Sequence, residues 1–128
     1  MSGATAIAAA IAASPWAALP GLSWRPAVAA VASPMWQAVE WSNWQVMDAA
    51  GETLGFVKCR EPDTAWMIDD PAAHVAARAA GEMGVAPEVL FHLPGQQAIG
   101  FRFLPAPWRG ARLDDLRRPD ILSAAIAA

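Results

Sequence analysis

Two strand-like runs separated by a short turn place the strongest restriction on the fold. Residues 35–48, MWQAVEWSNWQVMD, hold aromatic and β-branched residues in partial alternation, which is typical of a strand. The run TLGFVKCR at 53–60 puts alternate side chains on opposite faces, with Phe56, Lys58 and Arg60 on one face and Val57 and Cys59 on the other. Because the segment between them, AAGE, contains a glycine, the pattern predicts an antiparallel hairpin.

A helix and a second hairpin follow along the chain. Asp69 and Asp70 can cap a helix whose first position is Pro71, and the sequence PAAHVAARAAGEM continues it until Gly84, a residue that commonly ends helices. The runs EVLFHL (88–93) and AIGFRFL (98–104) are then joined by PGQQ. This order predicts two further strands connected by a turn.

The two ends of the chain add less regular elements. High alanine content predicts a short surface helix over residues 3–13, and one strand is expected within residues 19–34. A last helix is expected from about Pro119. Since strands and helices are segregated along the chain, the fold class is α+β. We expect an antiparallel sheet of about five strands with one flanking helix and an extra N-terminal helix.

Composition excludes several classes of function. The net charge is −3 with nine Lys and Arg residues, so no basic stripe is available for nucleic acid. The first 24 residues carry no charge, but they are mostly alanine and are interrupted by Pro15 and Pro20, so neither a membrane span nor a secretory signal is expected. The single Cys59 favours a reducing, cytoplasmic setting.

The apolar excess leaves two interpretations open. Hydrophobic residues make up 55% of the chain and charged residues only 16%, against about 25% charged residues in an ordinary domain. The chain either packs against a partner or a second lobe, or is simply rich in alanine.

The ordered segments resemble the N-terminal lobe of the aminoglycoside/choline kinase-like phosphotransferases, a family that includes thiamine and homoserine kinase relatives. SNWQVMDAAGETLGFVKCR resembles the nucleotide-loop hairpin, and IDDPAAHVAARAAGEMGVAPEVL resembles the long helix with the entry to the next strand. AIGFRFLPAPW resembles the last strand and hinge, and LDDLRRPDILSAAIAA the linker helix. The resemblance implies a protein-kinase-like N-terminal lobe at 19–104. An alanine-rich helix at 1–18 precedes it, and the hinge and the start of a truncated linker helix follow at 105–128.

The resemblance also implies a site. Lys58 would contact the α- and β-phosphates of ATP, or Arg60 would do so with a shifted register, and Ser42 and Asn43 would lie in the loop over the phosphates. Backbone groups of the hinge would bind adenine, at Phe103, Leu104 and Pro105. The complete family member uses ATP and Mg²⁺ to phosphorylate a small hydroxyl-bearing acceptor (choline, thiamine, homoserine or an aminoglycoside) held by the C-terminal lobe.

Departures from the family pattern support an alternative. Glu40 and Trp41 stand where the family has glycines, and Ala73 stands near the place of the helical Glu. Neither His74 nor His92 begins a His-x-Asp motif, so no catalytic residue or metal ligand is assigned and the chain alone is expected to be inactive. Whether it belongs to an enzyme is left open. The alternative is a degenerate, non-catalytic lobe that acts as a protein-interaction or homodimerisation module. In that case Lys58 is a solvent-facing strand lysine, and Ser42 and Asn43 are ordinary turn residues.

Overall fold

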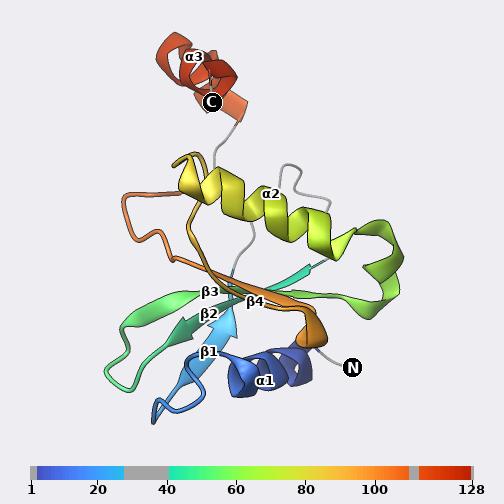
Figure 1. Ribbon diagram of the computed structural model, residues 1–128. Coiled ribbons are helices and arrows are strands. Elements are labelled where there is room, and N and C mark those ends of the chain that lie inside the picture. Colours follow the sequence, from blue (N-terminus) through green and yellow to red (C-terminus); the bar gives the residue numbers. More distant parts are fainter. Residues whose placement is uncertain (1–2, 28–40, 110–112, 128) are drawn as a thin grey trace.

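The computed structural model describes residues 3–27, 41–109 and 113–127. Five antiparallel strands form one sheet in the order β1-β2-β3-β5-β4 (Figure 1). The strands are β1 Ser23–Pro26, β2 Trp41–Met47, β3 Thr53–Arg60, β4 Val89–Leu93 and β5 Ala98–Phe101. The expected α+β class and five-stranded antiparallel sheet are therefore confirmed.

The hairpin between β2 and β3 forms where the sequence predicts it. Asn43 pairs with Lys58 and Trp44 with Val57 across the two strands. The turn is fixed by Asp48, whose Oδ1 accepts hydrogen bonds from the backbone N–H groups of Ala50 and Glu52, both at 2.9 Å. Gly51 takes a φ of 83°, a conformation that favours glycine. The first half of the predicted strand, residues 35–40, lies outside the described residues.

The other three strands also form in the segments where the sequence predicts them. The strand expected within 19–34 is β1, which pairs with β2. The second predicted hairpin is β4 and β5, joined by the 3₁₀ turn Pro94–Gln96, after which Gln97 has a φ of 51°. The last strand is shorter than predicted, because β5 ends at Phe101 and the chain beyond it leaves the sheet.

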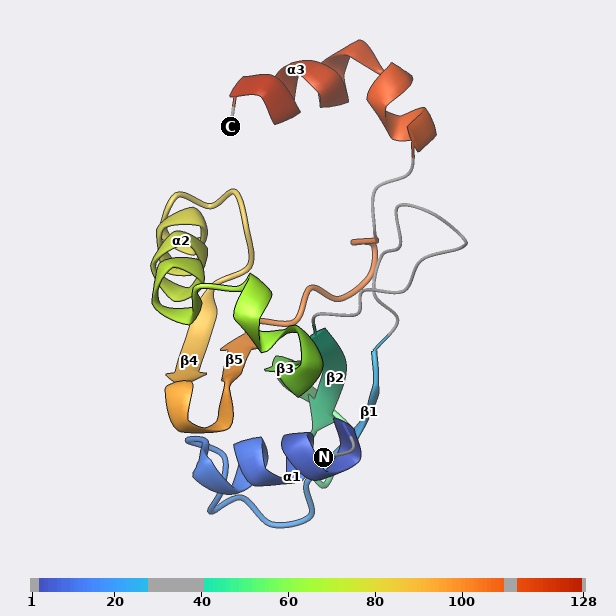
Figure 2. The ribbon, with the colours of Figure 1, turned by 90° about the vertical axis from the view of Figure 1, so that its right-hand side faces the viewer.

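Within the described ranges, three α-helices accompany the sheet, with short 3₁₀ turns at Pro62–Met67 and Leu113–Arg117. Helix α1 (Gly3–Ala13) covers one face and α2 (Asp70–Glu82) covers the other (Figure 1). Helix α3 (Pro119–Ala127) begins where the sequence predicts, contains no buried residue and lies apart from the sheet (Figure 2). No helix in these described ranges is long and apolar enough to cross a membrane.

Helix α1 supplies three of the seven residues in the buried core cluster of the described ranges, instead of lying on the surface as expected. Ile7 and Ala10 are fully buried, and Ile11 is nearly so. These side chains recur at the three- and four-residue spacing that places them on one helix face. They pack against four buried residues of the sheet: Val46, Val57, Cys59 and Ala98. Val57 and Cys59 share a face, as predicted, and this face is the buried one.

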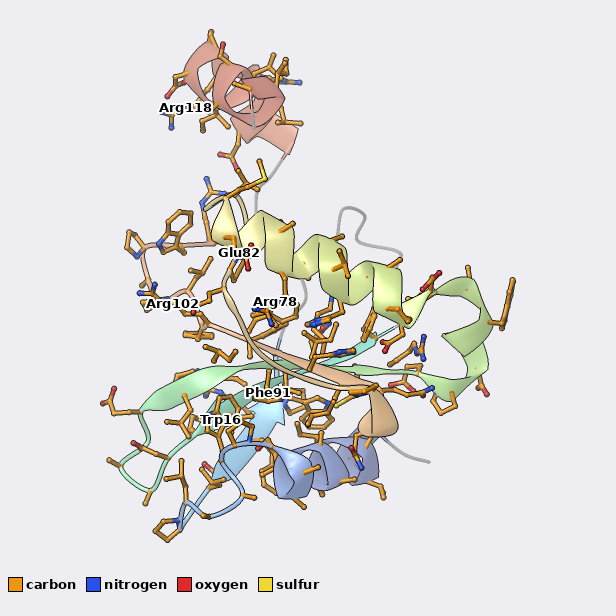
Figure 3. The ribbon with its side chains drawn as sticks, in the orientation of Figure 1. Trp16, Arg78, Glu82, Phe91, Arg102 and Arg118 are labelled. Carbon is orange, nitrogen blue, oxygen red and sulfur yellow. The ribbon has the colours of Figure 1, made fainter. Side chains whose placement is uncertain are left out.

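An aromatic pair completes the same side of the sheet. Trp16, just after α1, meets Phe91 of β4 edge to face, with the ring centroids 5.0 Å apart (Figure 3). The rings occupy space left by two glycines of the neighbouring strands. A Cβ on Gly55 would lie 2.6 Å from the Trp16 ring, and one on Gly100 would overlap the Phe91 ring. Packing of this kind requires glycine at both positions.

Candidate functional site

The face of the sheet opposite α1 carries an open pocket of about 510 Å³. Alternation along β3 directs Phe56 and Lys58 to this face, away from the buried Val57. Phe101 of β5 joins them because it is the register partner of Phe56. The pocket is lined by Phe56, Lys58, Pro87, Phe101, Arg102, Phe103, Leu104, Trp108 and Arg109. Most of this lining is apolar or aromatic, and three cationic side chains interrupt it.

The pocket brings together residues that the sequence proposes separately. Lys58 belongs to the candidate phosphate-binding strand, whereas Phe103 and Leu104 belong to the candidate hinge, and all three line the same cavity. They meet because β3 and β5 are paired neighbours, so the segment that leaves β5 passes beside the end of β3 that carries Phe56. An aromatic wall next to a lysine can hold a flat ring and an attached anionic group.

Lys58 is oriented by its neighbours in the hairpin. Its Nζ lies 5.3 Å from the centroid of the Trp41 ring, a distance at which an ammonium is attracted to the face of an indole. Asn43 is its register partner on β2. The Asn43 Oδ1 atom is buried and has no hydrogen-bond partner among the described residues. Trp41 therefore contacts Lys58, the residue for which a phosphate contact is predicted. A glycine at position 41, as in the family pattern, would leave the backbone open instead.

Asn43 and three other candidate residues do not line the pocket. Arg60 shares the face of Lys58, as predicted, but its Nη1 donates to the Ile68 carbonyl at 3.0 Å. Ser42 lies on the opposite face of the sheet, where a Cβ added to Gly3 of α1 would be 3.5 Å from the Ser42 Cβ. The Ser42 Oγ donates to the Cys59 carbonyl at 3.3 Å. Pro105 is exposed and is not one of the residues that line the pocket.

The cations at the rim of the pocket differ in their partners. Arg109 makes a two-pronged ion pair with Asp115, with both N–O distances at 2.7 Å. This hydrogen bonding and the carboxylate charge raise the pKa of Arg109. Arg102 is exposed beside the pocket, and its backbone N–H donates to the Glu88 carbonyl at 2.8 Å. Arg109 is thus held near the entrance by a carboxylate from the following segment.

The thiol of Cys59 is buried in the sheet and is not a nucleophile there. Burial, reinforced by the Glu61 charge, raises the pKa of the Cys59 thiol to about 12, which keeps it protonated and unreactive near neutral pH. Within the described part of the chain, no group of three His, Cys, Asp or Glu side chains could hold a metal ion.

Sequence reasoning missed six lining residues, and only some of them had a signal. Phe56 and Phe101 could have been found, because both alternate with assigned residues on predicted strands. The other four lie in irregular segments, and residue periodicity does not predict the path of such segments. They are Pro87, Arg102, Trp108 and Arg109.

Comparison with known proteins gives no further assignment: no family model, curated protein or solved structure matches the chain.

Proposed function

We propose that this chain is the nucleotide-binding lobe of a small-molecule phosphotransferase, with ATP as the ligand of the pocket. The observation that carries the proposal is the convergence of Lys58 with Phe103 and Leu104 in one aromatic-lined cavity. Adenine is a flat apolar ring, and its triphosphate needs cations for charge neutralisation. The pocket offers both kinds of surface in adjacent positions.

In this assignment the aromatic side chains hold the base and Lys58 contacts the phosphates. Phe56 and Phe101 are register partners on neighbouring strands and both line the pocket, and aromatic rings of this size can stack on a flat base. Lys58 Nζ, positioned over Trp41, supplies the positive charge. Mg²⁺, the general base and the site for a hydroxyl-bearing acceptor would be provided by a second, C-terminal lobe, in keeping with the family that the sequence resembles.

The test uses the fact that Lys58 is the sole lysine of the chain. Periodate-oxidised ATP forms an imine with a nearby amine, and borohydride reduction makes the link permanent. We expect mass spectrometry to locate the adduct on Lys58 and excess ATP to suppress it. In calorimetry, Lys58→Ala should weaken ATP binding by about tenfold or more, since a hydrogen bond to a charged group contributes about 1.5–3 kcal/mol.

Arg25→Ala is the matched control for that variant. Arg25 is a cation on the edge strand β1 that bonds Gln45 at 3.0 Å and does not line the pocket, so its removal deletes the same charge without touching the site. Equal losses for both variants would indicate only general electrostatic attraction. Absence of ATP binding at millimolar concentration, with labelling of Lys58 that excess ATP does not suppress, would exclude the nucleotide assignment.

A second candidate is a non-catalytic interaction module, including a homodimer. It is favoured by large apolar side chains that remain exposed around α2 and its flanking turns: Trp66 at 83%, Met67 at 55%, Val75 at 66% and Met83 at 69%. Apolar side chains of this size would be covered by a partner in such a module. A dimer in sedimentation analysis that Val75→Glu dissociates, together with no ATP binding, would favour this candidate.

A further inference from the structure

Helix α2 is attached to the sheet through an unusual set of side chains. Its half-buried residues are Ala73, His74, Ala77, Ala80 and Gly81, so His74 is the one large side chain on the inward face. Val75, which is apolar and larger than the alanines of the inward face, points outward and is 66% exposed. Small side chains bury little apolar area, and the docking of α2 therefore depends strongly on what His74 contacts.

His74 stacks on His92 of strand β4. The two ring centroids are 4.0 Å apart and the ring planes differ by 17°. On its other side His92 reaches back to α2, because its Nε2 lies 3.0 Å from Asp70 Oδ2. The side chains of His92 and Asp70 are only 15% and 10% exposed. The contact between helix and strand is thus a half-buried row of one carboxylate and two imidazoles.

This row can accommodate one added proton more readily than two. An imidazolium at His92 would be balanced by the Asp70 carboxylate, which itself lies in the first turn of α2, where the helix dipole favours negative charge. A second imidazolium at His74 would face the first at stacking distance. The Nδ1 atom of His74 is buried with no hydrogen-bond partner in the described residues, so no acceptor would stabilise a proton placed there.

The remaining charges nearby do not relieve this conflict. On α2, Arg78 lies one turn after His74 and adds positive charge (Figure 3). On β3, Arg60 holds the Ile68 carbonyl just before α2, and Lys58 lies in the same strand register row as His92, with the apolar Ile99 of β5 between them. Arg78, Arg60 and Lys58 thus add positive charge, and the exposed Glu82 pairs with Arg78 at 3.9 Å.

We propose that the docking of helix α2 on the sheet is acid-sensitive, and that α2 detaches when His74 and His92 are both protonated. Detachment separates the two imidazolium charges and gives His74 Nδ1 access to water. The function would be a conformational response to acidification, and it does not rest on the ligand assigned to the pocket.

The pH range follows from His74. Burial, followed by the neighbouring His92 and Arg78, lowers the pKa of His74 below its ordinary value of 6.5, while Asp70 acts in the opposite direction. The detached helix exposes His74 to water, so the detached state binds the proton more readily. The contribution of His74 to docking is therefore complete above about pH 6.5 and is lost as the pH falls below that value.

Amide hydrogen exchange, corrected for the intrinsic effect of pH on exchange rates, tests the proposal on the full chain without ligand. Between pH 7.5 and pH 5.5 we expect the protection of residues 73–82 to fall by up to about tenfold, the limit for one group with a pKa near 6.5 that binds its proton only in the detached state. Protection of the β2–β3 hairpin should stay constant. Equal changes in both regions, or none in α2, would overturn the proposal.

Two variants make the test specific. His74→Phe keeps an aromatic ring against His92 but cannot bind a proton, so α2 should remain protected at pH 5.5. Val75→Phe introduces the same side chain one residue away, on the exposed face, and removes no titratable group. It should leave the pH dependence of the wild type intact. A His74→Phe protein that loses α2 protection in acid as the wild type does would show that another group is responsible.

Discussion

At the scale of single residues, glycines decide how closely the aromatic pair can approach the sheet. Trp16 lies over Gly55, and Phe91 lies over Gly100. The Phe101 carbonyl would also be 2.9 Å from a Cβ at Gly55, and a backbone atom held in the β3–β5 ladder cannot move aside cheaply. The packing of the two rings therefore requires glycine at both positions. In the sequence this requirement is visible only as two glycines within strand-like runs.

Gly55→Ala should therefore destabilise the protein by about 1–3 kcal/mol, the usual cost of overpacking a core. Urea denaturation measures the change in the free energy of unfolding. Gly95→Ala is the control, because a Cβ at Gly95 meets nothing within 4 Å and Gly95 is not among the positive-φ glycines of the described residues. If the two variants were equally stable, the contact between Trp16 and Gly55 would not constrain the fold.

At the scale of elements, α2 combines a well-defined start with weak burial. The Asp69 side chain accepts a hydrogen bond from the Ala72 N–H at 3.1 Å, and Pro71 occupies the first turn. The helix ends at Glu82, with Met83 as its C-cap, and Gly84 follows with a φ of 74°. These local signals are independent of tertiary contacts, which explains why the sequence locates α2 to within one residue at either end.

Asp69→Ala should cost about 0.5–2 kcal/mol of stability through loss of this N-cap. The loss should appear mainly as faster amide exchange in the first two turns of α2. Asp69→Ser retains a capping oxygen and should recover most of the difference. Identical exchange in the alanine and serine variants would mean that tertiary contacts alone hold the start of the helix.

At the scale of the whole molecule, α1 and α3 are both apolar helices, but only α1 joins the core. Ile7 is completely buried against the sheet, whereas Ile126 of α3 is 77% exposed. Helix α3 packs against the turn Leu113–Arg117 and has no buried residue. The sheet and α1 therefore share one core, and the segment after β5 contributes to the pocket rather than to that core.

Ile7→Ala should lower the free energy of unfolding by about 2–5 kcal/mol, as expected for truncation of a buried side chain. Ile126→Ala makes the same chemical change in the exposed helix and should alter stability by less than about 0.5 kcal/mol. Thermal and urea unfolding compare the two variants directly. A large effect of Ile126→Ala would reveal that α3 is buried in solution, for example against a second copy of the chain.

The sequence by itself determined the α+β class, both hairpins and the bounds of the helices, because strand alternation, turn residues and helix caps act over a few neighbouring residues. It also determined that Lys58 and Arg60 share a face, since the side-chain period of a strand is fixed at two. Each of these inferences needs only local geometry.

Only the tertiary structure decided how those elements combine. Strand pairing joined Lys58 to Phe103 and Leu104 in one pocket and placed Ser42 on the other face of the sheet. The same assembly made α1 a core helix and stacked His74 against His92. These outcomes depend on contacts between residues far apart in the chain, and such contacts leave no periodic signal in the sequence.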